Sequence, residues 1–165
     1  MAPDPRIAVC PGSYDPVTLG HVDVISRAAA MFDQVVVAVV NASARKSHSL
    51  FSAEERVELI ERATAHLPNV SVETFSTLIV DYARERGAKA IVKGLRAISD
   101  FEYELEMNQL NRRLAPDVES VYLMASPQYS FLSSSGVKEI ATFGGDISEL
   151  VPEEVARRLQ EALAR

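Results

Sequence analysis

The sequence of 165 residues lacks several features that would each define a class of protein. Its only cysteine is Cys10, so no disulfide can form within the chain, and its three scattered histidines do not have the spacing of a zinc site. Its longest strongly apolar run, residues 35–40, is far too short to span a bilayer, and no signal-peptide pattern precedes it. We therefore expect a cytoplasmic protein with no structural metal.

Positive charge is also scarce, because 17 Lys and Arg face 23 Asp and Glu and leave a net charge of −6. A broad surface for nucleic acid or an acidic membrane would need a basic field, so we expect neither partner. Two phosphate-binding signatures are absent as well, since the sequence contains neither G-x-x-x-x-G-K-[ST] nor G-x-G-x-x-G. A phosphate ligand would have to be held by a local pocket of another kind.

Strand-like and helix-like patterns alternate along the whole chain. The patterns predict strands at residues 6–10, 35–40, 70–75, 90–92 and 118–124, and helices after residue 20, at 53–66, 78–86, about 100–114, through 137–141 and from 152. Such alternation indicates a parallel sheet with right-handed crossovers. We therefore predict a single-domain α/β fold over residues 1–165, a Rossmann-like, doubly wound, five-stranded parallel sheet with helices on both faces and a C-terminal helix.

Local signals predict where some of these helices begin. Residues 52–55 and 99–102 have the spacing of a capping box, and Pro152 is expected at the first position of the last helix. The helix that ends near residue 114 has apolar residues on more than one face, namely Phe101, Tyr103, Leu105, Met107 and Leu110. Such a helix is either deeply buried or in contact with another subunit, and we favour the second interpretation.

Polar segments that could perform chemistry follow three of the predicted strands. They are Thr18-x-Gly20-His21, Lys93-Gly94-Leu95-Arg96 and Ser133-Ser134-Ser135-x-x-Lys138. The carboxyl ends of parallel strands share one edge of a sheet, where open α/β proteins bind ligands, so these segments should converge. His21 lies in a first helical turn, which favours contact with phosphate. Lys138 is as compatible with a surface charge as with a phosphate contact, and Cys10 is expected to be inert packing within a strand.

These segments resemble the bacterial phosphopantetheine adenylyltransferases over nearly the whole chain. The resemblance lies in Pro11-Gly12-Ser13-Tyr14-Asp15-Pro16-x-Thr18-x-Gly20-His21, in Lys93-Gly94-Leu95-Arg96 with Asp100-Phe101-Glu102-Tyr103-Glu104, and in Tyr129-Ser130-Phe131-Leu132-Ser133-Ser134-Ser135-x-Val137-Lys138-Glu139. The T/H-x-G-H element alone marks a wider nucleotidyltransferase superfamily. Threonine at its first position favours the pantetheine branch.

The resemblance implies an enzyme of coenzyme A biosynthesis that transfers the adenylyl group of ATP to 4′-phosphopantetheine, giving dephospho-coenzyme A and pyrophosphate. It also implies Mg²⁺ bound with the ATP and a homohexamer. The attacking group is already a phosphate with a second pKa of about 6, so direct in-line attack needs neither a strong base nor a covalent intermediate. Two alternatives remain open: a related nucleotidyltransferase with another phosphate acceptor, and a non-catalytic nucleotide-binding module.

The resemblance also implies roles for individual residues. The catalytic set would be Thr18, His21, Lys46 and Arg96; the nucleotide-binding set Ser13, Tyr14, His21, Gly94, Leu95, Arg96, Glu104, Tyr129, Ser130, Phe131, Leu132, Ser133, Ser134 and Ser135; and the acceptor-binding set Ser13, Arg45, Lys46, Leu78, Ile79 and Lys93. The family's loop lysine falls at Arg45 or Lys46, of which we prefer Lys46. Gly136 stands where a larger residue is expected, which predicts a less rigid start for the helix that follows.

Overall fold

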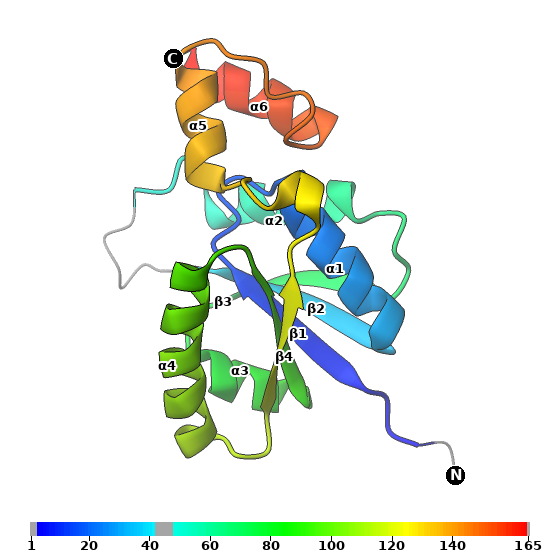
Figure 1. Cartoon of the computed structure of the whole chain (residues 1–165). Helices are drawn as coiled ribbons and strands as arrows, with labels where there is room; N and C mark the ends of the chain where they lie inside the picture. Colours follow the sequence, from blue (N-terminus) through cyan, green and yellow to red (C-terminus); the bar gives the residue numbers. More distant parts are fainter. Residues whose placement is uncertain (1–2, 42–47, 165) are drawn as a thin grey trace.

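The computed structural model describes residues 3–41 and 48–164 (Figure 1). Its centre is one sheet of five parallel strands in the order β3-β2-β1-β4-β5. The strands are β1 (Ile7–Gly12), β2 (Gln34–Val40), β3 (Val70–Phe75), β4 (Ala90–Leu95) and β5 (Glu119–Met124). The predicted sheet is confirmed, and its order reverses direction between β1 and β4.

Helices connect successive strands, as the alternating pattern predicts, and two further helices follow the last strand. They are α1 (Leu19–Met31), α2 (Ala53–Ala63), α3 (Ile79–Glu85), α4 (Ile98–Leu114), α5 (Ser134–Thr142) and α6 (Glu153–Leu163), with a short 3₁₀ turn at Pro127–Tyr129. No helix in the described part of the chain is long and apolar enough to cross a membrane.

The apolar core lies on both faces of the sheet. Successive strand residues point to opposite faces, so Cys10 joins one cluster and Val9 the other. The first cluster includes Ile25 of α1 and Leu59 of α2, and the second includes Val80 of α3. Helices α5 and α6 extend the first cluster beyond the carboxyl ends of the strands (Figure 1). The fold is therefore doubly wound, and the sheet edge formed by the carboxyl ends of the strands lies beneath α5.

Helix boundaries test the local signals. The capping box at residues 52–55 is confirmed, because Ser52 and Glu55 each accept from the other's backbone N–H. The one at 99–102 is wrong: α4 starts after Ala97 without a side-chain cap, and the carboxylate of Asp100 accepts from the backbone N–H of Arg96 instead. Pro152 is the N-cap of α6 and not its first helical residue, so the helix begins one residue later than predicted. Helix α2 also ends before the predicted residue 66, with Thr64 as its C-cap.

Helix α4 is the least covered element of the fold. None of its residues is buried, so the interpretation that α4 is a deeply buried helix is wrong for the single chain. Large apolar side chains on α4 are instead at least 46% exposed, namely Ile98, Phe101, Tyr103, Leu105, Leu110 and Leu114. The alternative interpretation, contact with another subunit, stays a prediction.

Candidate active site

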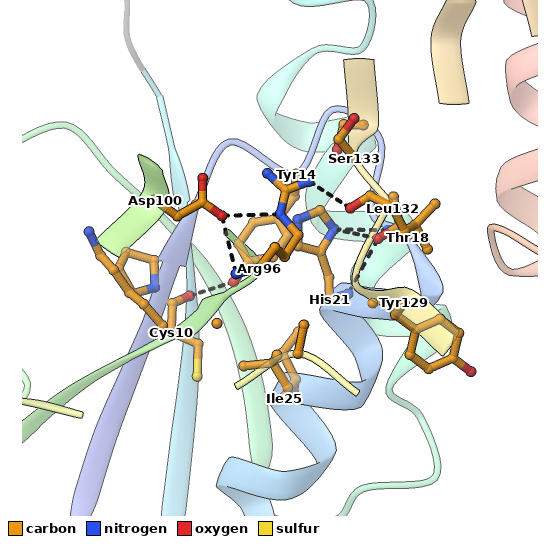
Figure 2. Close-up of a pocket in the computed structure, with 18 of the residues that line it drawn as sticks. Cys10, Tyr14, Thr18, His21, Ile25, Arg96, Asp100, Tyr129, Leu132 and Ser133 are labelled. Carbon is orange, nitrogen blue, oxygen red and sulfur yellow. Dashed lines mark hydrogen bonds and ion pairs between the residues drawn. The ribbon is translucent and has the colours of Figure 1, made fainter. Parts of the chain in front are cut away.

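A cavity of about 620 Å³ opens at the carboxyl ends of β1 and β4, where the strand order reverses (Figure 2). This is the place where open α/β sheets bind ligands. Residues from all three predicted segments line it, namely Thr18, Gly20, His21, Lys93, Gly94, Arg96, Ser133, Ser134 and Ser135. The structure thus brings the first of these segments together with the third, although more than 110 residues separate them in the sequence.

Thr18 and His21 form a reciprocal cap at the start of α1. The Thr18 hydroxyl accepts from the backbone N–H of His21 at 3.3 Å, and the Thr18 backbone N–H donates to His21 Nδ1 at 3.0 Å. Histidine here takes the place of the Glu or Gln of an ordinary capping box. Because Nδ1 accepts a hydrogen bond, the neutral imidazole carries its hydrogen on Nε2. The helix start therefore sets the tautomer of His21 and leaves Nε2–H as a donor for a ligand.

The charge state of His21 follows from its surroundings. Burial and, as the smaller cause, the positive charge of Arg96 together lower the pKa of the imidazole to about 4. The ring is therefore neutral at physiological pH. His21 can donate a hydrogen bond to a phosphate oxygen, but it carries no proton that it could give up as a general acid.

We expect the His21 imidazole to stay neutral in the folded protein from pH 8 down to about pH 5, and to take up a proton near pH 4. In the unfolded chain the same ring should titrate near its ordinary pKa of 6.5. Unfolding therefore takes up a proton between these values, so the free energy of unfolding should decrease as the pH falls from 6.5 to 4. NMR titration of the ring nitrogens measures this, and a folded-state pKa near 6.5 would refute it.

Two cations enter the cavity from the end of β4, and each is held by a carboxylate of α4. Lys93 Nζ lies 3.0 and 3.2 Å from the two carboxylate oxygens of Glu104. Arg96 pairs with Asp100 at 3.5 Å and donates to the carbonyl of Leu132 at 2.8 Å. Both cations are therefore oriented before a ligand binds. An incoming phosphate would take the place of carboxylates that are one helical turn apart.

The serine segment supplies the start of α5. Ser133 Oγ caps the helix by accepting from the backbone N–H of Gly136 at 3.0 Å, and Ser134 Oγ donates to the carbonyl of Pro16 at 2.8 Å. Both hydroxyls are thus engaged in holding the loop. The free backbone N–H groups of the first turn of α5 remain as anion donors at the rim of the cavity.

Several predicted site residues lie outside the set that lines the cavity. Ser13, Leu95, Ser130 and Phe131 are among them, and the side chain of Leu95 is buried. Leu78 and Ile79 lie at the start of α3, on the same edge of the sheet as the cavity. Arg45 and Lys46 fall outside the described residues. The other predicted positions, Tyr14, Glu104, Tyr129 and Leu132, do line the cavity.

Two residues that hold the framework of the site were given no role by the sequence analysis. Asp15 accepts from the backbone N–H groups of Leu50 and Phe51 at 2.9 and 3.0 Å and pairs with Lys138 at 3.1 Å. Arg56, only 5% exposed, donates to the carbonyls at the ends of two strands, Ser13 at 2.7 Å and Val40 at 3.1 Å. Both contacts join segments distant in sequence, so no local pattern signals them.

Lys138 lies in an ion pair, and Cys10 is buried. The Lys138 ammonium pairs with Asp15, and Lys138 is not among the residues that line the cavity, so its contact with a phosphate stays a prediction. Burial raises the pKa of the Cys10 thiol to about 12, so the sulfur is not a thiolate at neutral pH. The side chain of Cys10 is buried in the first core cluster, as expected for packing within a strand, and its lack of reactivity stays a prediction.

Comparison with known proteins places this site in a family. The cytidylyltransferase-like family model matches residues 9–140. The phosphopantetheine adenylyltransferase of Caldanaerobacter subterraneus subsp. tengcongensis is 53% identical over 156 residues, which cover 94% of this chain and 96% of that protein. A crystal structure from Vibrio parahaemolyticus, described as a nicotinate-nucleotide adenylyltransferase, shares the fold with a TM-score of 0.71 at 17% identity, covering 97% of this chain and 95% of its own. The chain therefore belongs to the cytidylyltransferase-like family and, within it, to the phosphopantetheine adenylyltransferases.

Proposed function

We propose that this protein transfers the adenylyl group of ATP to 4′-phosphopantetheine, giving dephospho-coenzyme A and pyrophosphate. The observation that carries the proposal is one cavity in which His21, the Lys93–Arg96 segment and the start of α5 meet, in a chain that is 53% identical to a phosphopantetheine adenylyltransferase. The cavity volume of about 620 Å³ is within the usual range for small-molecule sites.

The reaction requires positioning and charge more than proton transfer. An oxygen of the acceptor phosphate bonds to the α-phosphorus of ATP, and the bond from that phosphorus to the bridging oxygen of pyrophosphate breaks. The acceptor phosphate has a second pKa of about 6, so it is already a nucleophile at neutral pH. The neutral Nε2–H of His21 would donate to the oxygens on which negative charge develops. No enzyme-linked adenylate is needed, and the Cys10 thiol, with its pKa of about 12, is not a nucleophile.

The two cations divide the remaining work between the substrates. Lys93 would hold the acceptor phosphate, because its ammonium is a compact positive charge on a flexible stem and can rotate toward the ligand. Arg96 and the first turn of α5 would hold phosphates of ATP. Glu104 holds the Lys93 ammonium at the cavity wall, where the acceptor phosphate would replace the carboxylate as its partner.

Mg²⁺ would enter this reaction as the MgATP complex. Among the described residues, no group of three or more His, Cys, Asp or Glu side chains could hold a metal ion. The carboxylates that line the cavity, Asp100 and Glu104, each pair with a cation already. These observations support an ion held mainly by the ATP phosphates and water, as is usual for Mg²⁺.

The decisive experiment measures pyrophosphate release with ATP, Mg²⁺ and one acceptor at a time. We expect release with 4′-phosphopantetheine and none with pantetheine, which keeps the arm but lacks the attacking phosphate. Glycerol phosphate and nicotinamide mononucleotide test the related transferases. Release with either of these in place of 4′-phosphopantetheine would reject the proposed acceptor, and ATP binding without any release would indicate a non-catalytic nucleotide-binding module.

We propose a homohexamer as the working form because the family resemblance implies one, and the exposed apolar side chains of α4 support contact with another subunit. Exposed apolar groups gathered on one helix are typical of a surface that contacts another subunit, and Met124 at the end of β5 is also 68% exposed. Light scattering gives the assembly mass directly, and a mass of one chain would reject this part of the proposal. We also propose the cytoplasm as the site of action, because ATP is available there and the reducing conditions keep a free thiol such as Cys10 reduced.

A further inference from the structure

Tyr14 has an unusual backbone for its residue type. Its φ is 49°, in the left-handed region that residues other than glycine seldom adopt. Its side chain is only 6% exposed, although the residue stands in the loop that leads from β1 to the cavity. Backbone strain of this kind persists where surrounding contacts fix it, and it is frequent at functional sites.

Contacts on three sides determine where the Tyr14 ring lies (Figure 2). Its hydroxyl donates to the carbonyl of Cys10 at 2.9 Å, and its ring centre lies 4.9 Å from that of His21, with the planes at 68°. Gly12 makes room for the ring, since a Cβ at that position would lie 2.9 Å from a ring carbon of Tyr14. The phenol therefore cannot turn toward a nucleotide, and its ring packs against the imidazole.

We propose that Tyr14 is a positioning residue, whose buried ring fixes the plane of the His21 imidazole so that Nε2–H faces the reacting phosphates. The proposal rests on the proposed adenylyl transfer. Thr18 holds one edge of the imidazole through its backbone N–H and its hydroxyl, 3.0 and 3.1 Å from Nδ1, but both contacts meet the same ring nitrogen and leave the ring free to tilt about it. The perpendicular Tyr14 ring removes that freedom, in the edge-to-face arrangement that aromatic pairs prefer.

Tyr14 also accounts for part of the environment that keeps His21 neutral. Burial is the main cause of the low pKa of His21, and the Tyr14 ring is one of the groups that exclude water from the imidazole. The charged group that acts on the ring is Arg96, which a Tyr14 substitution leaves in place. Removing the aromatic ring should therefore raise the pKa of His21 while the effect of Arg96 remains.

The experiment compares Tyr14→Phe, Tyr14→Leu and a matched control, Tyr82→Leu. Tyr82 is 4% exposed, donates its hydroxyl to Glu73 at 2.7 Å and packs in the cluster on the opposite face of the sheet. We expect Tyr14→Leu to lower kcat about 30-fold with KM for ATP changed less than threefold, and Tyr14→Phe, which keeps the ring, to lower kcat several-fold less than Tyr14→Leu does. By NMR titration, the pKa of His21 should rise in Tyr14→Leu and not in Tyr82→Leu.

Each outcome bears on the proposal. Equal losses of kcat in Tyr14→Leu and Tyr82→Leu, or an unchanged His21 titration in Tyr14→Leu, would reduce Tyr14 to a stabilising residue and overturn it. Gly12→Ala provides a second variant should Tyr14→Leu fail to fold, because the added Cβ must displace the ring; it should move kcat and the His21 titration in the same directions. The His21 titration can be measured without turnover, so it tests the role of Tyr14 on its own. A wild-type protein that is inactive toward 4′-phosphopantetheine would reject the proposed function and leave the titration result unaffected.

Discussion

Replacing His21 with alanine should lower kcat about 100-fold or more while the affinity for ATP changes less than about threefold. The reason lies in the tautomer that the start of α1 imposes, because Nδ1 accepts from Thr18 and Nε2–H is left to donate. A neutral donor gains most when negative charge builds up on the transferring phosphoryl group, which happens in the transition state. Pyrophosphate release measures kcat, and calorimetric titration with a non-hydrolysable ATP analogue measures binding.

A second variant separates donation from the integrity of the helix start. His21→Gln places at this position a residue that ordinary capping boxes use, so its side chain can accept from the Thr18 N–H and preserve the first turn of α1. We expect His21→Gln to unfold at a temperature near that of the wild type and still to show a kcat reduced at least tenfold. Near-normal turnover in His21→Gln, or losses of ATP binding as large as the losses of rate in His21→Ala, would contradict the donor role.

The sheet could be predicted because the information for it is local. Residues 35–40 are apolar on both faces, and this segment and four other strand-like segments alternate with helical patterns, which is enough to indicate a parallel sheet covered on both sides. The predicted end of β4 was wrong for the opposite reason. The polar Lys93 interrupts the apolar run, but pairing with β5 continues to Leu95 opposite Met124, and the sequence alone does not reveal that partner.

The candidate site also has a part that the local sequence predicts and a part that depends on tertiary contacts. Its three segments could be found because each carries its own motif and each follows a strand, so the topology brings them together. The contacts that orient them could not be found. The pairing of Lys93 with Glu104 depends on how α4 packs beside β4. The packing of Tyr14 on His21 depends on a positive φ at Tyr14, which the identity of the residue does not indicate. Motifs locate the reacting groups, whereas tertiary contacts set their direction and charge.

Asp15 illustrates how strongly such contacts hold the site together. Substituting alanine should lower the free energy of unfolding by about 3 kcal/mol, because the backbone N–H groups of Leu50 and Phe51 would lose their acceptor and Lys138 its counter-ion. The Asp15 side chain is 8% exposed, so water cannot readily replace it. For a chain of this length, such a loss corresponds to a fall of roughly 6–12 °C in Tm.

Thermal and urea unfolding followed by circular dichroism measure the effect, with Asp33→Ala as the matched control. Asp33 also pairs with an arginine, Arg6, but both side chains are largely exposed, so water can replace that contact and Tm should hardly change. Similar small shifts in both variants would show that Asp15 is dispensable for the fold. A large shift for Asp15→Ala alone is the result expected if this carboxylate joins the loop after β1, the segment before α2 and helix α5. These are elements that surround His21, so the chemistry and the stability of the site would then depend on the same few contacts.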